Sequence, residues 1–203
     1  MGSLKKIGIM GGTFNPVHIG HLILAEKAYE QFELEKVYFM PSKKPPHKDL
    51  ANIISDKHRE NMVLLAIAEN PHFELSTLEL QREGTTYTVD TLEYLTNKES
   101  DTEFYFIIGA DSLFQLETWR EPEKILNMAK VVAATRYQLS DANILEQIKY
   151  LNTTYNTNID ILKIPTIDIS SKHIRESLKE NKSIKYYVPN SVEQYIKKNQ
   201  LYL

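Results

Sequence analysis

Residues 11–21, Gly-Gly-Thr-Phe-Asn-Pro-Val-His-Ile-Gly-His, bring together several groups that can hold a phosphate. Gly11 and Gly12 have no Cβ, so the backbone can come close to a ligand there. His18 and His21 each carry a ring N–H that can donate to a phosphate oxygen. A helix beginning in this stretch would add free backbone N–H groups and the positive end of its dipole. These residue types therefore predict an anion-binding turn.

The neighbouring segments are of the kind that would position such a turn. Residues 5–10 form a short apolar segment typical of a buried strand, and the residues after the turn place apolar side chains at helical spacing, namely Leu22, Ala25, Tyr29 and Phe32. We expect the helix to begin near Pro16 or Val17, which would place His18 and His21 on one face of its first turn. The stretch is then a strand-to-helix turn.

The two histidines could also be surface residues or part of a capped helix start, and a His-x-x-His pair can be half of a zinc site. Zinc usually needs a third ligand of known type, and because the chain has no cysteine that ligand would be another histidine or a carboxylate. The glycine spacing fits neither the dinucleotide fingerprint nor the P-loop. Since the histidines share one turn with Gly11, Gly12, Thr13 and Asn15, we favour a different kind of phosphate site over these alternatives.

A second candidate anion site lies at residues 169–175, Ile-Ser-Ser-Lys-His-Ile-Arg. It follows a predicted strand at residues 159–164 and leads into a predicted helix. Ser170 and Ser171 would add hydroxyl donors to the free N–H groups of the helix start. Arg175 lies one turn into the helix and could reach the same anion with its fork of donors.

Between these stretches, apolar segments at residues 36–40, 104–108 and 131–135 are predicted to be strands, with helical patterns between them. Alternating strands and helices predict a parallel sheet with right-handed crossovers. Sheets of this kind bind ligands beyond the carboxyl ends of their strands. A helix predicted at residues 55–70, with Met62, Leu65 and Ala66 on its inner side, is assigned to packing, with no chemistry.

Polar residues follow the predicted strands at that edge. Asp111, after Gly109, could bind ribose hydroxyls or a metal, or could only cap a helix. Arg136 could face a phosphate or only solvate the edge. The basic loop at residues 42–48, which contains His47, could border a ligand and close over it, or could be an ordinary solvated turn.

Two further stretches carry weaker signals. Thr86 or Thr88 is expected to be the N-cap of a helix that begins beside them, and capping alone would explain the threonines there. Trp119, the only tryptophan, lies among charged residues, which indicates partial exposure.

Length and composition exclude several classes of protein. A chain of 203 residues can form one domain with a sizeable core. The formal charge of −3 and the pI near 6.1 lack the basic signature of nucleic-acid binding, so we expect no nucleic-acid partner. The longest apolar run, residues 62–68, is too short to span a membrane, and no signal peptide is apparent. Without cysteine there is no disulfide framework, so a cytoplasmic location is expected.

The two candidate anion sites resemble the two signatures of the nucleotidyltransferase superfamily, which transfers adenylyl or cytidylyl groups. From residue 5 onward the chain resembles one family in it, the bacterial nicotinate-nucleotide adenylyltransferases. The resemblance implies an α/β fold, a Rossmann-like doubly wound parallel sheet with helices on both faces, in a single domain that includes the helical portion at residues 171–203. It implies transfer of the adenylyl group of ATP to nicotinate mononucleotide, giving nicotinate adenine dinucleotide and pyrophosphate in NAD biosynthesis. Mg²⁺ would accompany ATP, and a homo-oligomer is possible.

The resemblance also implies roles for individual residues. The catalytic residues would be His18, His21 and Arg175. ATP would be bound by those three and by Gly11, Gly12, Thr13, Phe14, Gly109, Asp111, Ile169, Ser170 and Ser171. Nicotinate mononucleotide would be bound by Asn15, Lys43, His47, Thr85, Thr86, Tyr87, Trp119 and Arg136, and no residue would be a dedicated metal ligand. Lys172 departs from the threonine usual in the family, and Thr86 departs from the usual serine.

Alternative functions remain open at this point. An adenylyltransferase for the amide form of the mononucleotide or for phosphopantetheine would keep both signatures. A nucleotide-sensing module without catalysis would bind ATP without turnover. A zinc-dependent hydrolase is the least favoured alternative.

Overall fold

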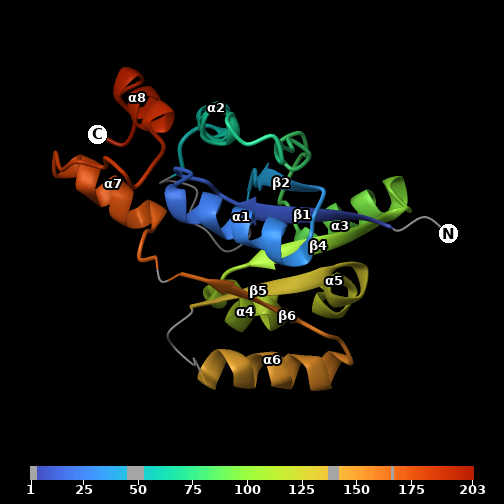
Figure 1. Ribbon diagram of the computed structural model, residues 1–203. Helices are drawn as coiled ribbons and strands as arrows, with labels where there is room; N and C mark the ends of the chain where they lie inside the picture. Colours follow the sequence, from blue (N-terminus) through green and yellow to red (C-terminus); the bar gives the residue numbers. More distant parts are fainter. Residues whose placement is uncertain (1–3, 45–52, 137–141, 166) are drawn as a thin grey trace.

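The computed structural model describes residues 4–44, 53–136, 142–165 and 167–203 (Figure 1). Within them, six strands form one sheet in the order β3-β2-β1-β4-β5-β6. All neighbouring strands are parallel. The strands are β1 (Lys5–Gly12), β2 (Lys36–Pro41), β3 (Phe73–Leu75), β4 (Thr102–Ile108), β5 (Lys130–Arg136) and β6 (Asp160–Ile164). The strand order reverses between β1 and β4, which makes the crevice between their carboxyl ends the expected place for a ligand.

Helices cover both faces of this sheet (Figure 1). One face is covered by α1 (Ile19–Phe32), α2 (Asp56–Ile67), α7 (Ser171–Lys179) and α8 (Asn190–Lys198). The other is covered by α3 (Thr88–Lys98), α4 (Ala110–Gln115), α5 (Pro122–Met128) and α6 (Ala142–Tyr155), and a short 3₁₀ turn, Leu116–Thr118, follows α4. The predicted doubly wound α/β fold is confirmed.

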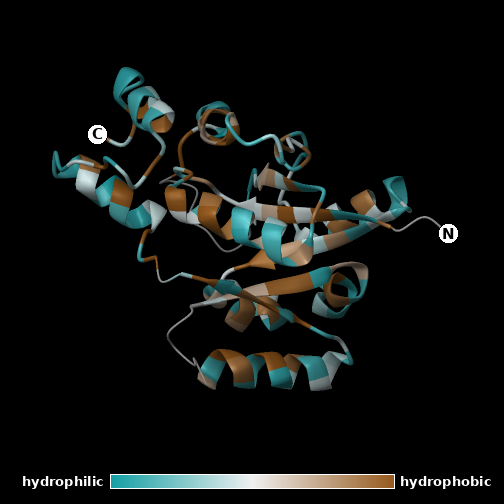
Figure 2. Cartoon of the chain, in the orientation of Figure 1, coloured by the Kyte–Doolittle hydropathy of each residue, from teal (hydrophilic) through white to brown (hydrophobic). Residues whose placement is uncertain are grey.

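The core is divided between the two faces, as β4 illustrates. Phe104, Phe106 and Ile108 are buried under α3 to α6, whereas Tyr105 and Ile107 are buried on the opposite face. Successive side chains of a strand point to opposite faces, so a strand buried on both faces needs an unbroken apolar run. Figure 2 shows hydrophobic residues on the central strands and on parts of the helices that cover them.

Two predicted helix starts were wrong. Helix α1 begins at Ile19 rather than near Pro16, because the chain first turns through Phe14, at φ 48°, and His18 is the extended N-cap residue. Helix α3 has Tyr87 as its N-cap, and no side chain caps it. Thr86 cannot serve because its side chain is buried outside the helix, and Thr88 is already the first helical residue.

The outer edge of β6 is bonded by a side chain from α1. Gln31 donates from Nε2 to the carbonyl oxygen of Ile161 at 2.6 Å, and its Oε1 accepts from the backbone N–H of Lys163 at 3.2 Å. The two bonds lie on either side of Leu162 in the sequence. This contact ties the first helix to the last strand of the sheet.

No helix among the described residues combines the length and apolar character needed to cross a membrane.

Candidate active site

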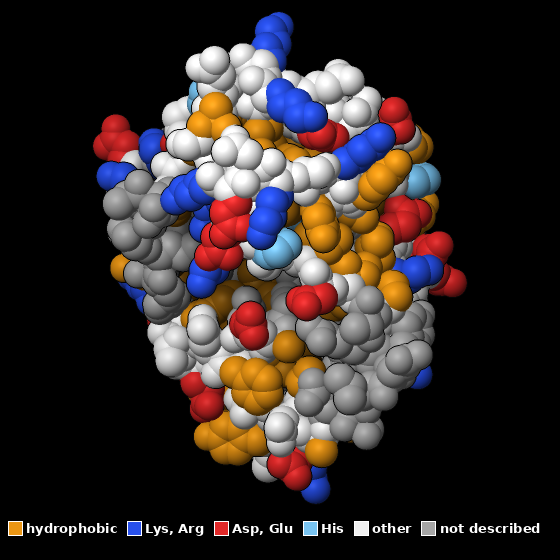
Figure 3. Space-filling model, turned by 90° about the vertical axis from the view of Figure 1, so that its left-hand side faces the viewer, with side chains coloured by type: hydrophobic (Ala, Val, Ile, Leu, Met, Phe, Trp, Pro, Cys, Tyr) orange, Lys and Arg blue, Asp and Glu red, His pale blue; other side chains and the backbone are white. Residues whose placement is uncertain are grey.

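A cavity of about 1290 Å³ opens at the carboxyl edge of the sheet. Figure 3 views this edge and shows a hollow with hydrophobic side chains inside and charged side chains of both signs at its rim. The cavity is lined from four places in the chain: the turn at residues 11–21, the loop before α3, the start of α4 and the start of α7. Pockets for a single small ligand commonly measure about 300 to 1,000 Å³, so this one is larger than that range.

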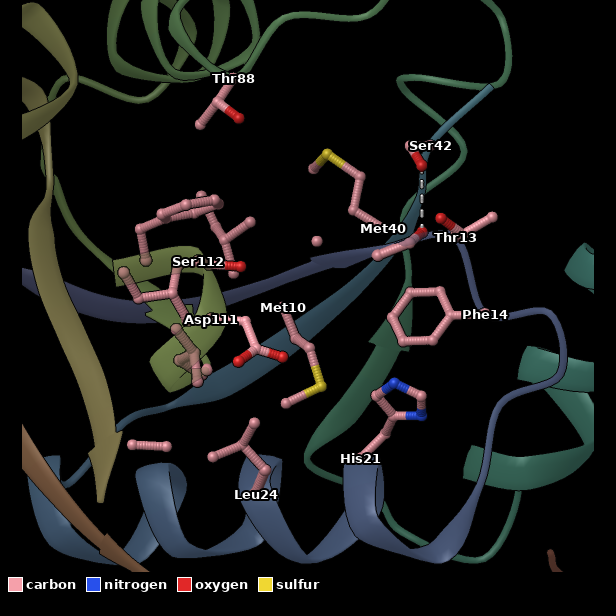
Figure 4. A pocket seen from close by; sticks show the side chains of 18 of the residues that line it. Met10, Thr13, Phe14, His21, Leu24, Met40, Ser42, Thr88, Asp111 and Ser112 are labelled. Atoms are coloured by element: carbon pink, nitrogen blue, oxygen red, sulfur yellow. Dashed lines mark hydrogen bonds between the residues drawn. The ribbon is translucent and has the colours of Figure 1, made fainter. Parts of the chain in front are cut away.

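The backbone of the turn is held by bonds to its carbonyl groups. The Gly12 carbonyl accepts from the backbone N–H of Ser42 at 2.9 Å and from its hydroxyl at 3.3 Å (Figure 4). The Thr13 carbonyl accepts from Nη1 of Arg59 at 2.8 Å. Ser42 follows β2, on one side of β1, and in a planar trans peptide the N–H points opposite to the C=O. The N–H of Thr13 therefore points to the other side, toward β4 and the crevice.

The second stretch meets the same turn. The Ser171 hydroxyl donates to the Pro16 carbonyl at 2.8 Å, and Nη1 of Arg175 donates to the Asn15 carbonyl at 2.8 Å. The Ser170 hydroxyl accepts from the backbone N–H of His173 at 3.1 Å, which makes it the N-cap of α7. The fold thus brings the two predicted anion sites together. Ser171 and Arg175 line the cavity and also hold the turn in place through these hydrogen bonds.

The two histidines are stacked at the start of α1. Their ring centroids are 3.7 Å apart, and the ring of Phe14 meets His21 edge to face at 5.0 Å (Figure 4). The backbone N–H of His18 donates to Nδ1 of His21 at 3.2 Å. Because Nδ1 accepts, the proton of a neutral His21 ring sits on Nε2, which becomes a hydrogen-bond donor.

His18 is a buried, neutral histidine. The residue is 7 % exposed, and burial lowers its pKa from 6.5 to about 4. Within the described part of the chain its Nδ1 has no hydrogen-bond partner. A buried polar atom without a partner, in the wall of a cavity, indicates a place where a ligand completes the bonding.

The lowered pKa of His18 predicts that the protein loses stability on mild acidification. The unfolded chain binds a proton at His18 below about pH 6.5, whereas the folded chain does so only near pH 4. Between these values the free energy of unfolding falls with falling pH, by about 2 kcal/mol at pH 5. Urea unfolding at pH 7.5 and pH 5 measures the difference. In the His18→Gln variant, the fall in the free energy of unfolding between pH 7.5 and pH 5 should be smaller by about 2 kcal/mol. An equal fall in both proteins would contradict the lowered pKa of His18.

The start of α4 faces the turn across the cavity. Asp111 and Ser112 lie opposite Phe14 and His21 in Figure 4. Gly109 is the N-cap of α4, and a Cβ placed on it would meet no atom within 4 Å. The predicted ATP-binding residues at this edge, Gly109, Asp111 and Ile169, all line the cavity.

Another part of the cavity wall, here called the aromatic end, carries two half-buried aromatic rings. Thr86, Tyr87 and Trp119 line it, and Trp119 meets Phe106 edge to face at 6.0 Å. Burial raises the pKa of the Glu79 carboxyl, which also lines this end. The Thr86 hydroxyl is buried beside this carboxyl, so this end also offers polar groups to a ligand.

Some predicted residues are not brought to the cavity. Lys43 and Thr85 are described, but the lining does not include them. His47 lies outside the described residues, as does most of the basic loop, and the side chain of Arg136 is likewise not described. Their assigned roles stay predictions.

The supporting or lining roles of four residues were not predicted from the sequence. Ser42 and Arg59 hold the turn, Arg120 lines the cavity with its guanidinium 5.0 Å from the Tyr87 ring centre, and the Tyr202 hydroxyl donates to Oδ1 of Asn15 at 2.9 Å. Burial raises the pKa of Tyr202, which keeps this hydroxyl protonated as a donor. Ser42 begins the basic loop that was predicted to border a ligand, and the other three residues belong to no recognisable motif.

Comparison with known proteins assigns the chain to a family. The model of the cytidylyltransferase-like family matches residues 9–177, so the chain belongs to this family of nucleotidyltransferases. Within it, the chain is 51 % identical over 200 residues to the probable nicotinate-nucleotide adenylyltransferase of Lachnoclostridium phytofermentans, covering 98 % of this chain and 100 % of that one. It is 44 % identical over 198 residues to the protein of the same name from Dictyoglomus thermophilum, with the same coverage.

Solved structures share the fold. The nicotinic acid mononucleotide adenylyltransferase of Plasmodium falciparum complexed with NaAD superposes with a TM-score of 0.80 at 24 % identity, covering 98 % of this chain and 97 % of that one. A nicotinate-nucleotide adenylyltransferase described as putative, from Vibrio parahaemolyticus, superposes with a TM-score of 0.67 at 22 % identity and covers 98 % and 96 % of the two chains.

Proposed function

We propose that the chain transfers the adenylyl group of ATP to nicotinate mononucleotide. The observation that carries the proposal is that one cavity joins the histidine turn to the aromatic end formed by Thr86, Tyr87 and Trp119. The first end suits a triphosphate and the second suits a planar ring. The full-length relatives named as nicotinate-nucleotide adenylyltransferases support the same reaction.

The reaction needs positioning more than acid–base chemistry. A phosphate oxygen of the mononucleotide, already anionic at neutral pH, attacks the α-phosphorus of ATP. The bond to the β-phosphate breaks, and pyrophosphate leaves with the electron pair. The protein must hold the two groups in line and stabilise charge on the triphosphate, which is the main source of catalysis in phosphoryl transfer.

Donors from this chain fit that task. His18 is neutral, the Nε2 of a neutral His21 is a donor, and the Thr13 N–H faces the crevice. Arg175 adds positive charge to the lining. Mg²⁺ would arrive with ATP and offset charge on the phosphates, bound largely by phosphate oxygens and water. Among the described residues, no group of three or more His, Cys, Asp or Glu side chains is placed to hold a metal ion.

Pyrophosphate release from Mg-ATP tests the proposal. Nicotinate mononucleotide, nicotinamide mononucleotide and phosphopantetheine are supplied in parallel. We expect release with the acid to be at least tenfold faster than with the amide. Release only with another acceptor would overturn the substrate, and ATP binding without release would favour a nucleotide-sensing module.

The Trp119→Ala variant is expected to weaken binding of the acceptor selectively. Stacking of a base on an aromatic ring contributes about 1–3 kcal/mol, which corresponds to at least a fivefold rise in KM for nicotinate mononucleotide. The KM for ATP should stay within twofold, because the proposal assigns Trp119 to the acceptor ring and not to ATP. Initial rates with each substrate varied in turn give both constants. The Trp119→Phe variant keeps an aromatic face, so its KM values should be close to those of the unchanged protein. Equal rises in both KM values of Trp119→Ala would remove Trp119 from the acceptor site.

We also propose a cytoplasmic location and a single domain over residues 1–203. A homo-oligomer remains a proposal to be tested by the mass of the purified protein in solution.

A further inference from the structure

Arg59, on the inner side of α2, is fully buried. Its Nη1 donates to the Thr13 carbonyl at 2.8 Å, and its Nη2 donates to Oδ1 of Asp56 at 2.6 Å. Its Nε has no hydrogen-bond partner among the described residues. The sequence assigned this helix to packing, with Leu65 on the inner side, but Leu65 is exposed and a charged residue takes an inner position.

A contribution to folding stability does not by itself explain why an arginine occupies this buried position. Burying a guanidinium is costly, and a buried ion pair often adds nothing over apolar residues of similar size. The Asp56 side chain is 41 % exposed, so water weakens its attraction for the cation. The unpartnered Nε adds to the cost. The remaining contact of Arg59 is with the Thr13 carbonyl, in the turn at residues 11–21. We therefore ask what this contact does for the site.

That contact fixes the orientation of one peptide group. Phe14 has a φ of 48°, in the left-handed region that residues other than glycine disfavour. Rotating the Thr13–Phe14 peptide by half a turn would bring φ of Phe14 to about −130°, out of the left-handed region. The rotation would also break the bond from Arg59 to the Thr13 carbonyl. Arg59 therefore opposes a rotation that would relieve the positive φ of Phe14.

The orientation decides what the cavity presents to an anion. Thr13 and Phe14 line the cavity, whereas Arg59 does not. With the Thr13 carbonyl turned to Arg59, the Phe14 N–H points away from α2. In the rotated peptide the negative end of a carbonyl dipole would take the place of that donor, which repels a triphosphate.

We propose that Arg59 is a positioning residue for ATP: it holds the Thr13–Phe14 peptide with its N–H available to the triphosphate. The inference rests on the proposed function, since it takes the turn to be the triphosphate site. Arg59 itself does not touch the substrate.

The test compares Arg59→Met with the unchanged protein. Met fills most of the space and has no donor, so the peptide is free to rotate. Calorimetry with Mg-ATP alone should show at least tenfold weaker binding, and KM for ATP should rise similarly while KM for the acceptor stays within twofold. A merely structural role would lower the active fraction, and hence the apparent kcat, without this split.

Two more variants complete the test. Arg59→Lys keeps one donor and should lose less ATP affinity than Arg59→Met, and it carries the test if the methionine variant does not fold. Asn61→Ala is the matched control: it removes a bond from the same helix to the Tyr195 hydroxyl, at 2.8 Å, and should leave ATP affinity unchanged. Unchanged ATP affinity in the Arg59 variants, or equal loss in Asn61→Ala, would overturn the proposal.

The calorimetry also separates this inference from the proposed function. If the unchanged protein binds Mg-ATP but releases no pyrophosphate with any acceptor, the function fails while the role of Arg59 is still measured. If it is active and Arg59→Met binds ATP normally, only the role of Arg59 fails.

Discussion

Replacing His21 with Ala is expected to lower kcat/KM for ATP at least a hundredfold. The Nε2 of a neutral His21 ring is a donor because Nδ1 accepts the backbone N–H of His18 at 3.2 Å. Losing one preorganised donor to developing charge typically costs about 10²–10³ in rate. Pyrophosphate release under saturating acceptor measures the loss.

The His21→Asn variant is the matched control for this result. The Asn side-chain oxygen can accept the His18 N–H as Nδ1 does, so the helix start should keep its bond, but Asn does not reach as far as Nε2. We expect the thermal stability of His21→Asn to stay close to that of the unchanged protein. Its rate of pyrophosphate release should fall as much as that of His21→Ala. A rate loss below tenfold in both variants would remove His21 from the mechanism, and the same threshold applies to His18→Ala.

The Gly109→Val variant should nearly abolish binding of Mg-ATP without unfolding the protein. A Cβ at this position meets no atom within 4 Å, so the new side chain enters open space in the cavity. The backbone there, with φ −80° and ψ 168°, suits a β-branched residue. We expect at least thirtyfold weaker ATP binding by calorimetry, with the midpoint of thermal unfolding changed by no more than about 2 °C.

Gly8→Ala should show the opposite pattern. Its Cβ would lie 2.9 Å from a methyl carbon of Leu34 in the packed core, so thermal stability should fall while the folded molecules bind ATP normally. If Gly109→Val binds ATP like the unchanged protein, the nucleotide does not occupy the space above Gly109.

The positions of the main site residues could be predicted from the sequence. Residues 11–21 and 169–175 each follow an apolar strand, and in a parallel sheet the carboxyl ends of the strands share one edge. That rule, with the resemblance of the two stretches to known signatures, places His21, Gly109 and Ser171 around one cavity, where the structure has them.

The supports of the site could not be predicted because they act across long stretches of sequence. Arg59 reaches Thr13 over 46 positions, and Tyr202 reaches Asn15 over 187. A charged residue on a helix is usually solvated, so nothing in the pattern marked Arg59 as buried. The helix starts were misplaced for a related reason, because the capping preferences of threonine are weak compared with the packing that buries Thr86.

The amide of Gln31 acts on β6 as a small piece of a further strand would. A neighbouring parallel strand offers one donor and one acceptor to the groups on either side of a residue, and Gln31 supplies both around Leu162. An exposed strand edge is a template on which another chain can pair and aggregate. By occupying these two bonding positions, one side chain makes this edge of the sheet a poor starting point for intermolecular strand addition.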